Sequence, residues 1–257
     1  MTTVDWSALD AVLFDLDGVL TPTAEIHERA WKEMFDSFLV TVAGEAPFSA
    51  SDYLLYVDGK PRFDGVRSFV QSRAIDLPEG THDDPPGIVS IGSLGNMKNE
   101  MFQTILRRDG IAAYPGSVQV MDALTARGTR IAVVSSSRNA PEVLAASGLA
   151  PRFEVVIDGS VAAQLGLPGK PAPDTFLEAA RQLGVPAGRA VVAEDAISGV
   201  AAGRAGGFGL VIGLDRGAGH DALRDAGADV VVDDLAQLLD SRGLLVSPGR
   251  LDSLGRS

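Results

Sequence analysis

The 257-residue chain contains no cysteine, which removes disulfides, thiolate metal sites and cysteine nucleophiles together. Any metal must therefore be held by oxygen atoms or by the three histidines. No apolar run approaches the roughly 18 residues of a membrane helix, and the start of the chain lacks the basic and apolar stretches of a secretory signal. These absences predict a cytoplasmic protein with no membrane partner.

Basic residues are scarce as well, with 22 Lys and Arg against 34 Asp and Glu and a net charge of −12. This balance argues against non-specific binding to a phosphate backbone, so nucleic acid is not expected as a partner. Most surface carboxylates are expected to serve solubility. A chain of this length with 46% hydrophobic residues can bury a substantial core and carry a smaller second domain.

Six short runs of apolar, mostly β-branched residues are bounded by polar or glycine-containing segments. Such continuous runs are typical of strands buried on both faces of a parallel sheet. Helical patterns separate them, which predicts an α/β fold with a doubly wound, Rossmann-like parallel sheet. The expected strands are Ala11–Phe14, Arg130–Val134, Glu154–Ile157, Ala190–Ala193, Phe208–Ile212 and Asp229–Val232. The expected helices are Ser117–Arg127, Ala140–Ala146, Asp174–Leu183 and Gly199–Ala205.

No buried-strand run occurs between the first expected strand and Tyr114. Helical patterns fill much of this interval, which indicates an α-helical cap domain inserted after the first strand. We expect the cap at residues 23–111 and the Rossmann-like core at residues 1–22 and 112–257. The expected cap helices are Thr23–Leu39, Asp64–Ala74 and Asn96–Arg108.

Two segments carry neither a strand nor a helix pattern. Leu77–Gly95 contains several prolines and glycines and is predicted to be a loop of the cap. Residues 241–257 are weakly patterned and are predicted to form a disordered tail. The linkers Thr21–Ala24 and Arg108–Tyr114 are expected to act as hinges that close the cap and exclude water.

Acidic or hydroxyl side chains follow four of the expected strands. Ligands of an open parallel sheet bind beyond the carboxyl ends of its strands, so these side chains are expected to converge. Buried unpaired carboxylates are costly, which implies a cation, a shared proton or solvent exposure. Oxygen donors favour one Mg²⁺ ion, with Asp15, Asp195 and the Asp17 carbonyl as ligands and Glu194 as a further candidate. The strand-end residues are Asp15, Asp17, Ser135, Ser136, Ser137, Asp158, Glu194 and Asp195.

A phosphate site is predicted beside these acids. Ser135 and Ser136 precede a helix and offer hydroxyls and free N–H groups to an anion. Lys170 is followed by proline, which favours an extended approach, and it supplies a positive charge. Taken singly, an Asp-Gly pair is usually a turn, a serine usually a helix cap and a lysine usually a surface residue. It is their combination that indicates phosphate chemistry.

At this point the chain resembles the haloacid dehalogenase superfamily, whose four motifs occur in order. The match spans the core from Ala11 to Gly213, and four ordered motifs at strand ends are far more specific than one Asp-x-Asp pair. The resemblance implies a phosphotransferase or phosphatase. The matching segments are Asp15-Leu16-Asp17-Gly18-Val19-Leu20-Thr21, then Ser135, then Lys170 in Gly-Lys-Pro-Ala-Pro-Asp, and finally Glu194-Asp195.

The resemblance also implies residue roles. Asp15 is the expected nucleophile, which forms an aspartyl-phosphate. Asp17 is the expected general acid that protonates the leaving oxygen and later deprotonates the acceptor. Ser135 and Lys170 are expected to hold the phosphoryl oxygens and offset the charge that develops in the transition state.

Further positions resemble the β-phosphoglucomutase branch of this superfamily. His27 and Trp31 lie on the helix after the first motif, and Gly59-Lys60-Pro61-Arg62 fits the branch's Gly-x-x-Arg specificity loop. The branch implies conversion of β-glucose 1-phosphate to glucose 6-phosphate, with a sugar bisphosphate as activator, by a monomer or weak homo-oligomer. The expected substrate-binding residues are His27, Gly59, Lys60, Arg62, Ser137, Arg138 and Asn139.

Two departures from the branch keep alternatives open. Asp58 stands where related mutases often carry lysine, and Pro22 where aspartate is common. The first alternative is a phosphatase of the same superfamily, in which water attacks the aspartyl-phosphate. The second is a non-catalytic phosphosugar sensor, against which the intact Asp15, Asp17 and Lys170 argue.

Overall fold

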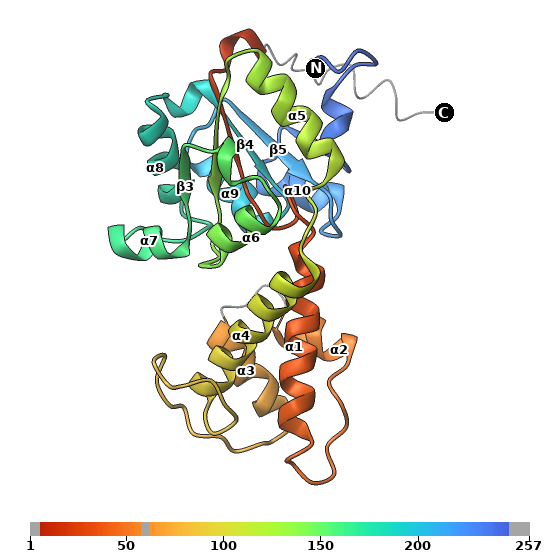
Figure 1. Cartoon of the computed structure of the whole chain (residues 1–257). Coiled ribbons are helices and arrows are strands. Elements are labelled where there is room, and N and C mark those ends of the chain that lie inside the picture. Colours follow the sequence, from red (N-terminus) through yellow and green to blue (C-terminus); the bar gives the residue numbers. More distant parts are fainter. Residues whose placement is uncertain (1–5, 58–61, 247–257) are drawn as a thin grey trace. The chain divides into compact units, whose positions relative to one another are not determined.

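A six-stranded parallel sheet forms the core of the computed structural model, which describes residues 6–57 and 62–246 (Figure 1). The strand order is β3-β2-β1-β4-β5-β6. This is the order of a doubly wound sheet, so the predicted α/β, Rossmann-like fold class is confirmed. The strands are β1 (Ala11–Phe14), β2 (Arg130–Val134), β3 (Val155–Ile157), β4 (Ala190–Glu194), β5 (Leu210–Leu214) and β6 (Val230–Val232).

The strand order reverses beside β1. The chain moves outward from β1 through β2 to β3, then returns to β4 on the other side of β1. Ligands of doubly wound sheets bind at such a reversal, beyond the carboxyl ends of the strands. The residues that follow β1, β2 and β4 are therefore neighbours at the edge where chemistry is expected.

Helices connect the strands and bury the apolar faces of the sheet. All four residues of β1 are buried, and α8 packs against β1, β2 and β3 while α9 packs against β4 and β5. This burial explains the continuous apolar runs in the sequence. The helices are α5 (Pro115–Ala126), α6 (Ala140–Ala146), α7 (Gly159–Leu165), α8 (Asp174–Leu183), α9 (Ile197–Ala205) and α10 (His220–Ala226).

Two sequence predictions for the core are wrong in part. The fifth strand begins at Leu210 instead of Phe208, and the Gly209 N–H before it is shared between the carbonyls of Ala187 and of Ala190, the first residue of β4. Residues 241–246 of the predicted disordered tail are ordered: the Val246 N–H donates to the Leu238 carbonyl at 2.8 Å, and the Trp6 indole donates to the Val246 carbonyl at 2.8 Å. Residues 247–257 lie outside the described part of the chain.

A second compact unit, Thr23–Gly110, is inserted between Met1–Pro22 and Ile111–Ser257. Among its described residues, the regular elements are helices. Its centre is an aromatic cluster in which the ring of Phe35 stacks on Trp31 and Phe48 and contacts Phe69. The helices are α1 (Thr23–Leu39), α2 (Ala50–Asp52), a π-helical turn (Tyr53–Val57), α3 (Arg62–Ser72) and α4 (Ile91–Asp109).

The predicted cap loop Leu77–Gly95 is wrong over its last five residues, where α4 has already begun. Ser90 and Ser93 form a reciprocal capping box, which satisfies the first N–H groups and starts the helix at Ile91. Gly95 does not break α4, because its missing side chain makes room for Phe63: a Cβ there would lie 2.6 Å from the Phe63 ring.

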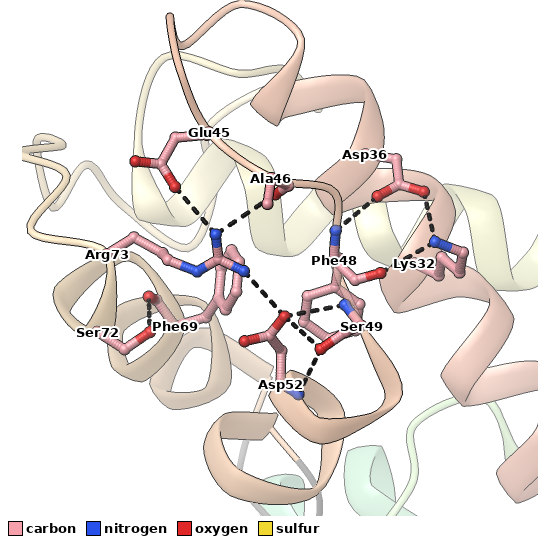
Figure 2. A network of polar contacts seen from close by, with 10 residues as sticks. All are labelled: Lys32, Asp36, Glu45, Ala46, Phe48, Ser49, Asp52, Phe69, Ser72 and Arg73. Atoms are coloured by element: carbon pink, nitrogen blue, oxygen red, sulfur yellow. Dashed lines mark hydrogen bonds and ion pairs between the residues drawn. The ribbon is translucent and has the colours of Figure 1, made fainter.

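A polar network ties the turn after α3 to α2 and to the segment before α2 (Figure 2). The Arg73 guanidinium bonds to Glu45 at 3.0 Å and to Asp52 at 2.9 Å, and it lies over the Phe69 ring. Asp52 also accepts a hydrogen bond from the Ser49 N–H, while the Ser49 side chain accepts one from the Asp52 N–H. Arg73 thus links Glu45 and Asp52, and its guanidinium covers one ring of the aromatic cluster.

We expect Arg73→Met to destabilise the protein by about 2 kcal/mol, because Glu45 and Asp52 lose a half-buried cationic partner. Denaturant unfolding followed by circular dichroism measures the change. The matched control is Arg67→Met, an arginine within α3 whose partners Asp64 and Glu79 are exposed and whose loss should change stability far less. Equal effects of the two substitutions would show that the network contributes nothing special.

Candidate active site

The segment after β1 is a tight loop that carries Asp15 and Asp17. The Gly18 N–H donates to the Thr21 carbonyl at 2.8 Å, and the N–H groups of Leu20 and Thr21 both donate to the Leu16 carbonyl at 3.0 Å. Gly18 has a φ of 85°, and a Cβ on it would lie 2.0 Å from Asp195 Oδ2. Only glycine satisfies both the left-handed backbone and this close approach to an acid.

Lys170 is the centre of a buried ionic cluster. Its Nζ lies 2.5 Å from Asp15 Oδ1, 2.6 Å from Glu194 Oε1 and 3.1 Å from the Val134 carbonyl oxygen. The three charged side chains are at most 9% exposed. Burial lowers the pKa of Lys170, but Asp15 and Glu194 outweigh it and hold the lysine charged. Lys170 therefore fixes one oxygen of Asp15.

Ser135, which directly follows β2, connects the loop after β1 to the loop after β2. Its hydroxyl donates to Asp17 Oδ2 at 3.1 Å and accepts the Ser137 N–H at 3.0 Å. Ser137 in turn accepts the Asn139 N–H at 3.1 Å. The loop is thus held by its own hydroxyls, with Ser136 and Arg138 exposed and Asn139 buried.

Glu194 positions Lys170 rather than facing outward. Its Oε1 accepts a hydrogen bond from Lys170 Nζ, and its Oε2 accepts one from the Ala196 N–H at 2.8 Å. A Cβ on Gly199 would lie 1.8 Å from Glu194 Oε1, so α9 must carry glycine at this point for the glutamate to fit. The glycines of this segment therefore serve close packing around the cluster.

We expect Gly199→Ala to lower turnover by about 100-fold, because it displaces Glu194 and with it Lys170. Steady-state kinetics of the purified variant measures the loss. Gly188→Ala is the matched control, since a Cβ there meets nothing within 4 Å. An active Gly199→Ala variant would contradict the idea that Glu194 sets the position of Lys170.

The donor set fits a hard divalent cation. Four carboxylates, those of Asp15, Asp17, Glu194 and Asp195, face a single lysine. Burial and the Glu194 charge raise the pKa of Asp195 to about 7, and burial raises the pKa of Asp15 against the opposing effect of Lys170. An excess of buried negative charge on oxygen atoms is what Mg²⁺ would neutralise.

Asp158, which follows β3, has a different role from the other strand-end acids. Its Oδ1 accepts the N–H groups of Ser160 at 2.7 Å and Val161 at 2.8 Å and so caps α7. It therefore belongs to the fold rather than to the acidic cluster.

The cap unit contains a second group of polar residues. His27 Nδ1 lies 2.7 Å from Lys98 Nζ, and the His27 ring stacks on Phe102. Burial, with a smaller effect of Lys98, lowers the pKa of His27 well below 6.5, so the ring is neutral and Nδ1 accepts from the ammonium. Lys98 is itself only 5% exposed and lies over the Trp31 and Phe102 rings.

Lys98 is a candidate that the sequence reading missed. It lies within an expected helix, where a lysine is normally on the surface. The signal that was available is its four-residue spacing from Phe102, which places it on the apolar face. Arg62, which was predicted, is half-buried and donates to Asn96 Oδ1 at 3.2 Å. Gly59 and Lys60 lie outside the described residues.

A search of the described residues finds no helix with the length and apolar character required to span a membrane.

Comparison with known proteins defines the class to which this fold and acidic cluster belong. The chain belongs to the haloacid dehalogenase-like hydrolases, whose family model matches residues 9–207. It is 52% identical over 238 residues to the β-phosphoglucomutases of Mycobacterium tuberculosis and Mycobacterium bovis, covering 89% of this chain and 91% of each relative. A solved structure of CbbY from Rhodobacter sphaeroides with phosphate is 26% identical, with a TM-score of 0.69 and coverage of 92% and 99%.

Proposed function

We propose that the protein is a Mg²⁺-dependent phosphotransferase that interconverts β-glucose 1-phosphate and glucose 6-phosphate. The observation that carries this proposal is the buried cluster in which Lys170 bonds to both Asp15 and Glu194 at the reversal of the sheet. The similarity to mycobacterial β-phosphoglucomutases supports the choice of substrate. The proposed substrate is a small sugar phosphate. We further propose that the enzyme is cytoplasmic and works as a monomer or weak homo-oligomer.

Asp15 is the nucleophile in this proposal. Lys170 holds Oδ1, and the other carboxylate oxygen attacks the phosphorus while the bond from phosphorus to the departing sugar oxygen breaks. Lys170 and the Ser135 region offset the charge that builds on the phosphoryl oxygens. Asp15, Asp195 and the Asp17 carbonyl would hold Mg²⁺, which would supply further neutralisation of that charge.

Asp17 moves the protons. It gives a proton to the departing sugar oxygen, then takes one from the hydroxyl group that accepts the phosphoryl group from Asp15. The Ser135 hydroxyl donates to its Oδ2 and so holds the carboxyl in one orientation. A carboxyl with a fixed hydrogen-bond donor is well placed for transfer in both directions.

A mutase must also hold the second phosphate group of its bisphosphate intermediate. In the core, the Ser137–Asn139 loop offers an exposed arginine beside ordered hydroxyl and amide groups. In the cap, Arg62 is held by Asn96, and His27 and Lys98 form a buried pair. We assign these residues, with Gly59 and Lys60, to substrate binding.

A coupled assay tests the proposal. Pure protein receives β-glucose 1-phosphate, Mg²⁺ and a catalytic amount of glucose bisphosphate, and glucose 6-phosphate and inorganic phosphate are followed together. Isomerisation without phosphate release is the expected result. Release of phosphate without isomerisation would instead favour a phosphatase. This is the alternative function, and the 26% identity to a CbbY structure with bound phosphate is compatible with it.

Mg²⁺ should stabilise the protein more in base than in acid. Asp195 has a folded pKa of about 7 against 3.8, so the folded state keeps a proton that the unfolded chain has released, and metal-free stability falls as pH rises between these values. Thermal unfolding with and without Mg²⁺ at about pH 5 and about pH 8 measures the effect. The gain should shrink in Asp195→Asn, and equal gains at both pH values would contradict this account.

A further inference from the structure

Arg216 contacts the catalytic loop although no step of the proposed mechanism uses it. It lies just beyond β5, and its Nε donates to the Gly18 carbonyl at 2.8 Å. Its Nη1 donates to the Asp233 carbonyl at 2.9 Å, and its guanidinium lies 4.1 Å from the centre of the Tyr114 ring. One side chain thus joins the segments that follow β1, β5 and β6 to Tyr114, the residue before α5.

The loop that carries Arg216 is itself clamped. Asp215 Oδ1 accepts the N–H groups of Gly217 at 2.8 Å and Gly219 at 3.0 Å. His220 Nε2 lies 2.8 Å from Asp233 Oδ1 and 3.7 Å from Asp215 Oδ2. These polar contacts connect the segment after β5 to the segment after β6. The backbone that carries Arg216 is therefore held in place.

Three consecutive carbonyl groups of the catalytic loop receive donors from outside the loop. Arg216 donates to the Gly18 carbonyl, the Ser117 hydroxyl to that of Val19 at 2.7 Å, and the Tyr114 N–H to that of Leu20 at 2.9 Å. Ser117 and Tyr114 act from the start of α5. Arg216 reaches the loop from the segment after β5, and its guanidinium lies over the Tyr114 ring, so it links the two sets of donors.

The Gly18 peptide is the point where such support matters most. Gly18 follows Asp17 directly and lies against Asp195, so rotation of its peptide would move both acids relative to each other. Glycine has more backbone freedom than any other residue, and here that freedom cannot be removed by a side chain because a Cβ would meet Asp195. The Gly18 N–H is held by the Thr21 carbonyl, and an external donor to the Gly18 carbonyl restrains the following peptide bond as well.

We infer that Arg216 is a positioning residue, which fixes the Gly18 peptide and thereby the orientation of Asp17 beside Asp195. It acts through the loop, by its hydrogen bond to the Gly18 carbonyl. The inference rests on the proposed function of the Asp15 site. Tyr114 contributes by holding the guanidinium plane with its ring and the Leu20 carbonyl with its N–H group.

The test compares Arg216→Met, Arg216→Lys and the control Arg224→Met, whose exposed arginine on α10 pairs only weakly with Asp221. We expect Arg216→Met to lower kcat by about 10- to 100-fold with KM changed less than about twofold, because misplacement acts on the reacting geometry and not on binding. Arg216→Lys keeps one donor and should recover part of kcat. Arg224→Met should behave as the wild type.

A second measurement does not depend on activity. Hydrogen exchange of the metal-free proteins reports on the Gly18, Leu20 and Thr21 amides, which are hydrogen-bonded within the loop. We expect faster exchange there in Arg216→Met and unchanged exchange in β1. Wild-type kinetics and wild-type exchange in this variant would overturn the inference. An inactive wild type would instead overturn the proposed function, and the exchange data would still decide the role of Arg216.

Discussion

Replacement of Asp15 by asparagine should reduce turnover by about 10⁴-fold or more, because an amide cannot attack phosphorus. The fold should survive, since asparagine has the same shape and its carbonyl oxygen still accepts from Lys170. Metal-free stability should not fall, because burial and neighbouring acids already raise the pKa of Asp15 and penalise its charge. Steady-state kinetics and thermal unfolding of the variant measure the two quantities.

Detection of the phosphorylated enzyme separates the nucleophile from its partner acid. With an acyl phosphate as donor, whose carboxylate leaving group needs no proton, intact-mass measurement after rapid acid quench should show a phosphorylated species in Asp17→Asn, in which transfer from the aspartyl-phosphate is slowed, and none in Asp15→Asn. Asp158→Asn is the control for a strand-end acid outside the cluster, and it should retain turnover. Appreciable turnover or phosphorylation of Asp15→Asn would refute the assignment.

Lys170→Met should remove both activity and stability. Asp15 and Glu194 would remain buried without a cation, which costs about 3–5 kcal/mol when one partner of a buried ion pair is deleted. Turnover should fall by at least about 10²–10³-fold, since one donor to the transferring phosphoryl group is lost and Asp15 is no longer held. Denaturant unfolding and kinetics measure the two losses separately.

A double variant distinguishes the two causes. Adding Glu194→Gln to Lys170→Met removes one uncompensated charge, so part of the stability should return while turnover stays lost. Measurements without Mg²⁺ isolate the effect of the side chains. If stability fell further in the double variant, the glutamate and lysine would not form the coupled pair that their 2.6 Å separation indicates.

The sequence predicted the fold well where burial alone decides the pattern. β1, β2, α1, α6 and α8 span the residues expected for them, because buried β-branched runs and amphipathic helices leave strong periodicities. The predicted family is confirmed by the family match over residues 9–207. Most of its motifs could be recognised because they directly follow strands that the apolar runs had already located.

The sequence predicted poorly where glycine has a packing role. Gly92 and Gly95 favoured a loop, yet both lie in α4, where a Cβ would meet Thr81 or Phe63. In a sequence, a glycine can indicate either a flexible loop or a position where another part of the chain approaches closely. Only the tertiary neighbours decide which of the two applies. Ser90, the cap of α4, carried a signal that the glycines obscured.

Of the basic residues discussed, some could be predicted from the sequence and others could not. Lys170 was predicted because a motif surrounds it, whereas Lys98 offers only its four-residue spacing from Phe102 and Arg216 stands in a segment with no distinctive spacing. Their contacts, to His27 in one case and to Gly18 in the other, join positions far apart in the chain. Local patterns carry no information on such pairings, so only the folded structure shows them.

The hydrogen bond from the Tyr114 N–H to the Leu20 carbonyl bears on how such proteins diversify. It brings the exit from the catalytic loop next to the start of α5, so the 88 residues of Thr23–Gly110 leave and re-enter the sheet unit at one point. An insertion with adjoining ends can be exchanged, shortened or transplanted without altering any strand. Specificity is thereby free to evolve on one segment while the phosphate chemistry of the other is preserved.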